Sequence, residues 1–247
     1  MTQSCPSTGA AVSISIAVLT HNETREFKWL MGSLEVAKEL IDEIVIVDDY
    51  SDVEFLDVVQ SFKVDWPIKF FQRRLNKNFA AQRNFAKSQC TGRLIFFPDA
   101  DEIPSARILV GLPTLLAWME SNDVDVCYLP RLNIVTREEE IRDPPTVTPK
   151  DTIFSSWEDQ VRILRNLSKL KFVKRIDEGL YGFEGVYRFP QSQDFALLHV
   201  KTQSRVSRQN AFYRSFRARR MTKLWNSFAK RTFRIERPRP ISFPPPV

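Results

Sequence analysis

The sequence predicts an α/β fold with a mostly parallel central sheet, followed by an α+β second half. Apolar, β-branched runs alternate with segments of helical spacing as far as about residue 121, and short connections join them. Hydrophobic residues make up 43% of the 247 residues and aromatic residues 12%, which is enough for a sizeable core. No apolar run approaches the roughly 20 residues that a membrane-spanning helix needs.

The first half of the chain predicts strands and helices in alternation. The stretch SISIAVLT has the β-branched, apolar character of a buried strand, and Phe27, Leu30 and Leu34 follow it at helical spacing. Thr24 is a candidate cap for that helix, and Pro104 is expected to open a later one because proline is tolerated in a first turn. The predicted strands lie at about 13–20, 43–49, 68–72 and 93–98, and the predicted helices at about 24–40, 53–62, 78–90 and 104–121.

The second half is expected to hold shorter strands and one long basic helix. The stretch VDVCYLPRLNIV predicts a strand, and a polar segment from about 136 to 152 is expected to form a lid-like loop. QVRILR, KFVKRI and FALLHVK predict three more strands, and a helix is expected from about 206 to 230 before a proline-rich tail. The chain is therefore divided into segments 1–12, 13–121, 122–202 and 203–247.

Charge is distributed unevenly along the chain. The formal net charge is +6, but residues 201–247 contain 13 Lys or Arg and one acid, so that segment carries +12 and the first 200 residues carry −6. This pattern indicates an acidic body with a basic tail. The three cysteines, Cys5, Cys90 and Cys127, lie far apart without metal-type spacing, so a reducing cytoplasm is the simplest compartment.

Two clusters of carboxylates follow predicted strands. Asp48 and Asp49 end one strand, and Asp99, Asp101 and Glu102 follow the apolar run RLIFFP. Because right-handed crossovers bring the C-terminal ends of parallel strands to one edge, both clusters are expected there. Their mutual repulsion indicates either a solvated turn or a bound cation. Since the chain has 7 glycines and no glycine-rich phosphate loop, we expect a divalent cation to neutralise the phosphates of a nucleotide.

Four motifs resemble those of the family-2 glycosyltransferases. They are VLTHNET, VIVDDYSD, NFAAQRNFAKSQCTG and FFPDADE, in matching order and spacing over roughly residues 13–200. The resemblance implies a single A-type, Rossmann-like domain, with residues 13–121 binding a nucleotide-sugar and residues 122–202 forming the acceptor side. WEDQVRILRN, FVKRIDEGLYG and LLHVK are similar to the branch that includes lipopolysaccharide-core glucosyltransferases.

The resemblance also implies roles for individual residues. Asp101 would bind the metal ion, and Asp99 would contact the ribose, or the metal through water, with Glu102 orienting either one. His199 is a further candidate for the metal or the diphosphate. The predicted nucleotide-sugar contacts are completed by residues of the first three motifs, namely Thr20, Asn22, Glu23, Asp48, Asp49, Arg83 and Asn84.

Two carboxylates are candidates for the base that takes the acceptor proton in an inverting transfer. Glu178 is preferred, because the related branch carries a His-Glu pair where this chain has Asp177 and Glu178. Asp159, in WEDQ, is the alternative, since many family members use an aspartate from a Glu-Asp pair at a helix start. The implied activity is an inverting, metal-dependent transferase that uses Mn²⁺ or Mg²⁺ and a nucleotide-diphosphate sugar, with a UDP-sugar expected.

The basic tail is expected to face an anionic partner. Its candidate contacts are Arg208, Arg214, Arg217 and Arg220. A lipid-linked or polysaccharide glycan acceptor is preferred, which places the enzyme in the cytoplasm or at the inner membrane face. The alternatives are a glycosyltransferase acting on a hydroxymethylated base in DNA and a non-catalytic α/β module that binds nucleic acid.

Overall fold

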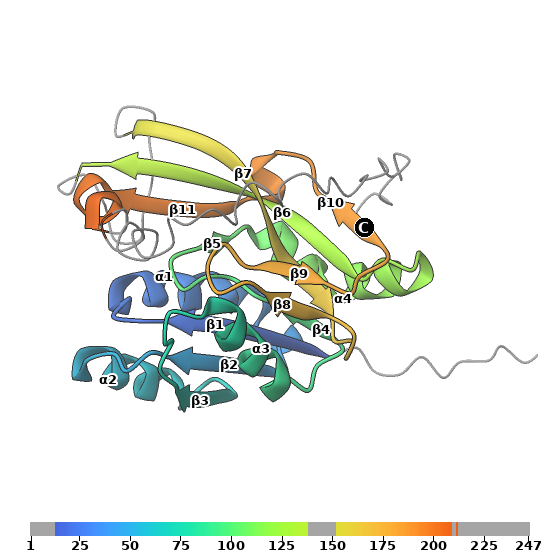
Figure 1. Ribbon diagram of the computed structural model, residues 1–247, viewed down its shortest axis with the longest axis horizontal. Coiled ribbons are helices and arrows are strands. Elements are labelled where there is room, and N and C mark those ends of the chain that lie inside the picture. Colours follow the sequence, from blue (N-terminus) through green and yellow to red (C-terminus); the bar gives the residue numbers. More distant parts are fainter. Residues whose placement is uncertain (1–12, 138–151, 209–210, 212–247) are drawn as a thin grey trace, which may run out of the picture.

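The computed structural model describes residues 13–137, 152–208 and 211 (Figure 1). The first half contains β1 (Ile14–Thr20), α1 (Thr24–Leu34), η1 (Glu35–Leu40), β2 (Glu43–Asp48), α2 (Val53–Phe62), β3 (Ile68–Gln72), α3 (Phe79–Gln89), β4 (Leu94–Phe96), β5 (Ile103–Pro104) and α4 (Ala106–Ser121). The second half contains β6 (Val126–Thr136), β7 (Thr152–Arg165), β8 (Lys171–Val173), β9 (Gly179–Tyr181), β10 (Val186–Arg188), η3 (Gln193–Phe195) and β11 (Leu197–Thr202).

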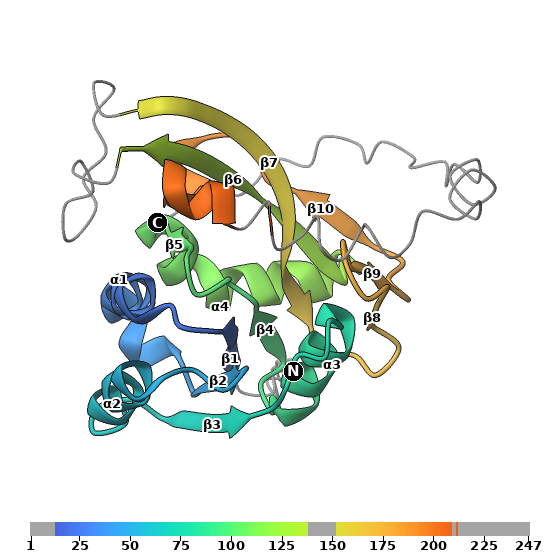
Figure 2. The same ribbon diagram turned by 60° about the vertical axis from the view of Figure 1, so that its left-hand side comes forward.

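The first half is a parallel sheet with helices on both faces, as the alternation of strands and helices predicts (Figure 2). Neighbouring strands run in the order β3, β2, β1, β4. Ile14, Ile16 and Val18 point to the face covered by α1, α2 and α4, whereas Ala17 points to the opposite face, which α3 covers. Both faces are therefore buried, which explains why these strands are continuously apolar.

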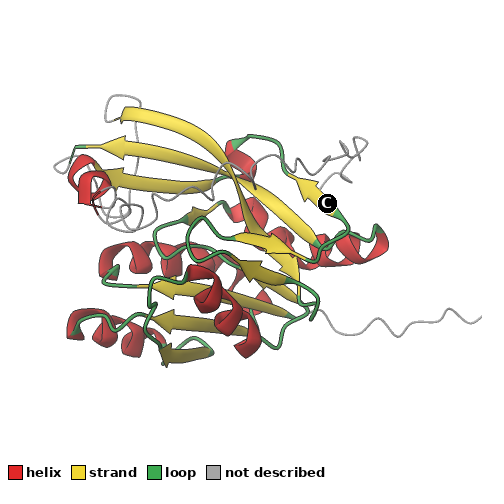
Figure 3. Cartoon of the chain, viewed as in Figure 1, coloured by secondary structure: helices red, strands yellow, loops and turns green. Residues whose placement is uncertain are grey.

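The second half adds strands of both directions, so the complete sheet is mixed, with β7 and β5 running against its other described strands. Within the described residues the order continues from β4 to β7, β6, β11 and β5, with β10 beside β6. β7 runs antiparallel to β4 and β6, while β6 and β11 are parallel. β7 pairs with β4 only over its last residues, from Ile163 to Arg165, and its remainder pairs with β6. Figures 1 and 3 show β6, β7 and β11 extending together past the parallel strands.

Several predicted boundaries differ from the structure for local reasons. The predicted strand QVRILR is the end of the 14-residue β7, so Asp159 lies within a strand and not at a helix start. The helix predicted from Pro104 begins at Ala106, because Pro104 pairs with β11 and the Ser105 side chain caps the helix. Thr24 is the first helical residue of α1 and does not act as its cap.

Some predictions fall outside the described residues. These are the segment 1–12, most of the predicted loop, the proline-rich tail, and most of the predicted basic helix, including Arg214, Arg217 and Arg220. Of that helix, residues 206–208 and 211 are described and are helical, and exposed Arg208 is among them. No helix in the described part of the chain is long and apolar enough to cross a bilayer.

Candidate active site

A cavity of about 1770 Å³ lies at the carboxyl edge of the parallel strands, beneath β6, β7 and β11. Many residues predicted for the site line it, namely Thr20, Glu23, Asp49, Arg83, Asp99, Asp101, Asp159, Glu178 and His199. Three predicted contacts, Asn22, Asp48 and Asn84, are not among its lining residues. The cavity therefore brings together carboxylates that lie far apart in the sequence.

The ends of β1 and β2 form one wall of the cavity. Thr20 is buried, and its hydroxyl has no hydrogen-bond partner among the described residues. Asp49 uses Oδ1 to accept a hydrogen bond of 2.9 Å from the backbone N–H of Leu75. The fully buried Asp48 instead holds the turn after β2, since its carboxylate accepts hydrogen bonds from the N–H and hydroxyl of Ser51. Thr20 and Asp49 are thus the predicted residues that this wall presents to a ligand.

Asn22 and Asn84 have structural contacts that the sequence did not reveal. Asn22 has a φ of 54° and its side chain accepts from the N–H of Asp52 at 2.8 Å, which joins the loops after β1 and β2. The Asn84 amide holds β8 against α3, because it accepts from the N–H of Phe172 at 2.9 Å and donates to its carbonyl at 2.8 Å.

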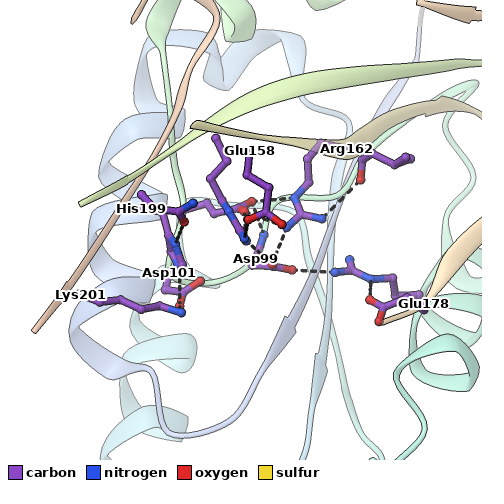
Figure 4. A network of polar contacts seen from close by, with 12 residues as sticks. Asp99, Asp101, Glu158, Arg162, Glu178, His199 and Lys201 are labelled. Atoms are coloured by element: carbon purple, nitrogen blue, oxygen red, sulfur yellow. Dashed lines mark hydrogen bonds and ion pairs between the residues drawn. The ribbon is translucent and has the colours of Figure 1, made fainter. Parts of the chain in front are cut away.

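Arginines surround the first carboxylate of the acidic motif (Figure 4). Arg83 Nη2 donates to Asp99 Oδ1 at 2.8 Å, and Arg162 Nη2 donates to Asp99 Oδ2 at 2.5 Å. Arg162 also donates from Nε to the fully buried Glu102 at 2.7 Å, and Arg131 contacts Glu102 at 3.3 Å. Burial opposes ionisation of Asp99, but Arg162 and Arg83 outweigh it and lower its pKa to about 2. The repulsion within the motif is therefore already relieved at Asp99 and Glu102.

Asp101 lies apart from those arginines, among residues of β11 and the segment after it (Figure 4). Its Oδ2 is 3.1 Å from His199 Nε2, 3.2 Å from Lys201 Nζ and 3.2 Å from Arg205 Nη2. Burial opposes ionisation here as well, but His199 and Lys201 hold the pKa of Asp101 well below its usual range. The pKa of nearby Glu23 shifts in the opposite direction. Burial and the negative charge of Asp101 raise it to about 8, although Arg205 contacts the Glu23 carboxylate.

Asp101 and His199 fit a divalent cation better than Asp99 does. Both Asp99 oxygens accept hydrogen bonds from arginines, whereas the contacts of Asp101 with His199, Lys201 and Arg205 all fall on Oδ2 and leave Oδ1 without a partner among the described residues. The described residues contain no cluster of three or more His, Cys, Asp or Glu side chains that could hold a metal ion. Mg²⁺ in nucleotide enzymes is commonly held by one or two carboxylates and completes its shell with phosphates and water. Asp101 offers one such carboxylate, and the His199 imidazole lies beside it.

The two candidate bases are each paired with an arginine. Glu178 Oε1 accepts from Arg83 Nε at 2.7 Å, and its side chain is 16% exposed. Asp159 Oδ2 accepts from Arg188 Nη1 at 3.2 Å, and its side chain is 34% exposed. The guanidinium of Arg188 also stacks on Tyr128, with its carbon 3.8 Å from the ring centre. Both carboxylates line the cavity, so the geometry keeps both as candidates.

The sequence did not predict most of the basic side chains that contact the carboxylates of the acidic motif, Asp99, Asp101 and Glu102. Arg131 lies in the apolar stretch CYLPRLNIV and Arg162 in QVRIL. A lone arginine within an apolar strand must find a buried partner, and this was the available signal. Lys201 and Arg205 carried no such signal, because both belong to a stretch rich in basic residues.

The fold and site together define an A-type glycosyltransferase-like α/β domain with a mixed central sheet. The chain matches the glycosyl transferase family 2 over residues 15–190, well over half of its length, and it belongs to that family. The narrower likeness to lipopolysaccharide-core glucosyltransferases stays a prediction.

Solved structures of TarS from S. aureus share the fold. The chain is 17% identical to TarS 1–349 with a TM-score of 0.50, covering 84% of this chain and 64% of that one. A longer TarS structure gives 18% identity and the same TM-score, covering 84% and 39%. A complex of TarS 1–349 with UDP-GlcNAc gives 16% identity and a TM-score of 0.50, covering 78% and 59%. The chain thus spans less than two thirds of these relatives. No curated protein matches it significantly.

Proposed function

We propose that the protein is an inverting glycosyltransferase that moves a sugar from a nucleotide-diphosphate sugar, a UDP-sugar by preference, to an acceptor hydroxyl. The observation that carries this proposal is the meeting of Asp49, Asp101 and Glu178, from three separate loops, in one cavity. Its volume of about 1770 Å³ exceeds the roughly 300–1,000 Å³ of a typical small-molecule pocket. There is therefore room for donor and acceptor together.

In the proposed reaction, the acceptor oxygen bonds to the anomeric carbon as the bond from that carbon to the diphosphate breaks. Glu178 takes the acceptor proton, and the nucleoside diphosphate leaves with the electron pair. A divalent cation held by Asp101 and His199 would supply positive charge for the leaving diphosphate. Lys201, with Nζ 3.2 Å from Asp101, supplies further positive charge at the same end of the cavity.

Thr20 and Asp49 are proposed to contact the nucleoside. The buried hydroxyl of Thr20 has no partner among the described residues, and a ligand hydrogen bond would satisfy it. Asp49 uses one carboxylate oxygen for Leu75, which leaves the other for an imide or ribose donor. Glu23, predicted for the same wall, is proposed to act only indirectly, because Arg205 binds its carboxylate at 2.6 Å.

The acceptor is proposed to be a glycan hydroxyl. Tyr181 lies three residues after Glu178, lines the same cavity and is 44% exposed, so it offers an aromatic face and a hydroxyl to a ligand there. Comparing the salt dependence of binding to anionic vesicles and to duplex DNA would test the role of the basic tail. Binding to DNA alone would favour the DNA-base acceptor instead.

A panel of nucleotide-sugars, each incubated with Mn²⁺ or Mg²⁺, tests the activity through the nucleotide released. We expect release from at least one UDP-sugar, and its loss in chelator or in Asp101→Ala. Full activity in chelator would contradict the metal site, and the absence of release from every donor would contradict the function.

The assignment of the base has its own test. Glu178→Gln is expected to keep nucleotide-sugar binding while turnover falls by about 10² or more, because the proton acceptor is lost. Asp159→Asn is the matched control and is expected to retain most of the turnover. If the two variants behave in the reverse way, Asp159 is the base.

A further inference from the structure

Arg83 links the candidate base to the acidic motif. Its Nε donates to Glu178 Oε1 at 2.7 Å, and its Nη2 donates to Asp99 Oδ1 at 2.8 Å. The side chain is only 8% exposed, and its guanidinium carbon lies 5.8 Å and 5.7 Å from the ring centres of Phe97 and Phe172. Because the guanidinium is planar and its donors form a rigid fork, these contacts fix the two carboxylates relative to each other.

Glu178 lies at the end of a turn that needs support from outside. This turn joins β8 to β9, and within it Lys174 and Asp177 have φ values of 70° and 51°, in the left-handed region that non-glycine residues rarely adopt. Helix α3 provides the support. Asn84 binds both backbone groups of Phe172 at the base of the hairpin, and the adjacent Arg83 holds the Glu178 carboxylate.

We propose that Arg83 is a positioning residue that acts on the reaction through Glu178. Through Arg83, helix α3 sets the position of the base relative to the part of the cavity where Asp99 lies. This inference rests on the proposed function for the role of Glu178. It replaces the expectation that Arg83 contacts the donor phosphates, since Nε and Nη2 of Arg83 are already bound to carboxylates.

A double-mutant cycle separates these two roles. Arg83→Gln is expected to lower kcat about 10-fold or more while the dissociation constant for the nucleotide stays within about twofold. Combined with Glu178→Gln it should cost nothing further, because both changes remove the same positioned base. Arg83→Lys keeps the charge but has no fork to hold both carboxylates, so it should be impaired in kcat as well. Lys171→Gln, an exposed change on the same hairpin, is the matched control.

Hydrogen exchange provides a measurement that does not need activity. Amides of residues 174–181 should exchange faster in Arg83→Gln and Arg83→Lys than in the wild-type protein or in Lys171→Gln. Additive rate losses with weaker nucleotide binding would overturn the proposal, as would unchanged exchange in both Arg83 variants. If the wild-type protein released no nucleotide from any donor, the proposed function would fail. The exchange data would still decide whether Arg83 holds the hairpin.

Discussion

Individual arginines offset the electrostatic repulsion between Asp99 and Glu102 inside the protein. Their partners are arginines of helix α3 and of strands β6 and β7, and Arg162 contacts both carboxylates. Asp101, two residues after Asp99, is matched separately by side chains of β11 and by Arg205. Arginines therefore neutralise Asp99 and Glu102, whereas side chains of β11 and Arg205 neutralise Asp101.

Loss of Arg162 should be costly because it leaves the fully buried Glu102 and the partly exposed Asp99 with too little positive charge. We expect Arg162→Gln to lower the free energy of unfolding by about 3–5 kcal/mol, measured by urea denaturation. Arg107→Gln is the matched control, since Arg107 pairs with Asp194 at 2.8 Å on the surface, where such pairs contribute about 1 kcal/mol or less. Equal losses in the two variants would contradict this account of the motif.

Glu43, at the start of β2, predicts a specific acid sensitivity. Burial opposes its ionisation, but hydrogen bonds from Lys69, Ser15 and Thr91 outweigh it and lower its pKa from 4.5 to about 2. A depressed pKa in the folded protein contributes stability above pH 4.5 that is lost as the pH falls towards 2. Glu43→Gln should therefore be less stable at pH 7 and lose less stability across that window.

Urea denaturation at pH 7, 4.5 and 3 measures the effect of Glu43. Glu35→Gln serves as the control, because the Glu35 carboxylate is 53% exposed and only 3.8 Å from Lys38. A Glu43 variant with the same pH dependence as the wild-type protein would show that this carboxylate is not the acid-sensitive group.

Single residues differ in how far the sequence could place them. Asp49 and Asp101 could be found because each follows a strand that its own apolar run identifies. The partners of Arg162 could not, since Glu102 and Asp99 lie 60 and 63 residues away and one sequence does not tell which charges pair. Motif carboxylates were therefore predictable, while the cations that set their pKa values were not.

At the scale of elements, strands and helices with strong apolar patterns were predicted well. The predicted bounds of α2 and β3 agree with the structure, as does the parallel pairing of the first half. The first part of β7 was not predicted because the residues with which it lines the cavity are mostly polar. There, Ser156 and Glu158 face the cavity while Trp157 is 36% exposed, so no apolar run marks the strand. The antiparallel pairing of β7 with β4 and β6 was consequently not predicted.

The hairpin of β8 and β9 depends on the glycine that follows it. Gly182 has a φ of 89°, and a Cβ there would collide with the carbonyl of Lys169. Gly182→Ala is expected to destabilise the protein by about 1–3 kcal/mol. Gly32→Ala is the opposite control, because nothing lies near that position within α1 and alanine is favoured over glycine in helices by about 1 kcal/mol. Thermal unfolding of both variants checks the pair, and a stabilised Gly182 variant would contradict the assignment.

At the scale of the whole molecule, the cavity exists because the two halves of the sheet diverge. β7 joins β4 only at its end, and the strands beyond that point cover the carboxyl edge of the parallel half. The wall formed by the ends of β1 and β2, together with Asp101, thus comes from the first half of the chain. His199 and Asp159 come from the second half. A ligand that contacts both halves should stabilise the folded protein as a unit.

Nucleotide and metal are therefore expected to raise the melting temperature together. At a free nucleotide concentration 100 times its Kd, binding contributes about 2.7 kcal/mol, which corresponds to a shift of about 5–10 °C for a protein of this size. UDP with Mn²⁺ should give this shift, and Asp101→Asn should lose the part that depends on the metal, because the variant has lost the carboxylate that faces His199. Lys171→Gln should respond as the wild-type protein does. A shift that is equal with and without Mn²⁺, and unchanged in Asp101→Asn, would show that the nucleotide binds without a metal at this position.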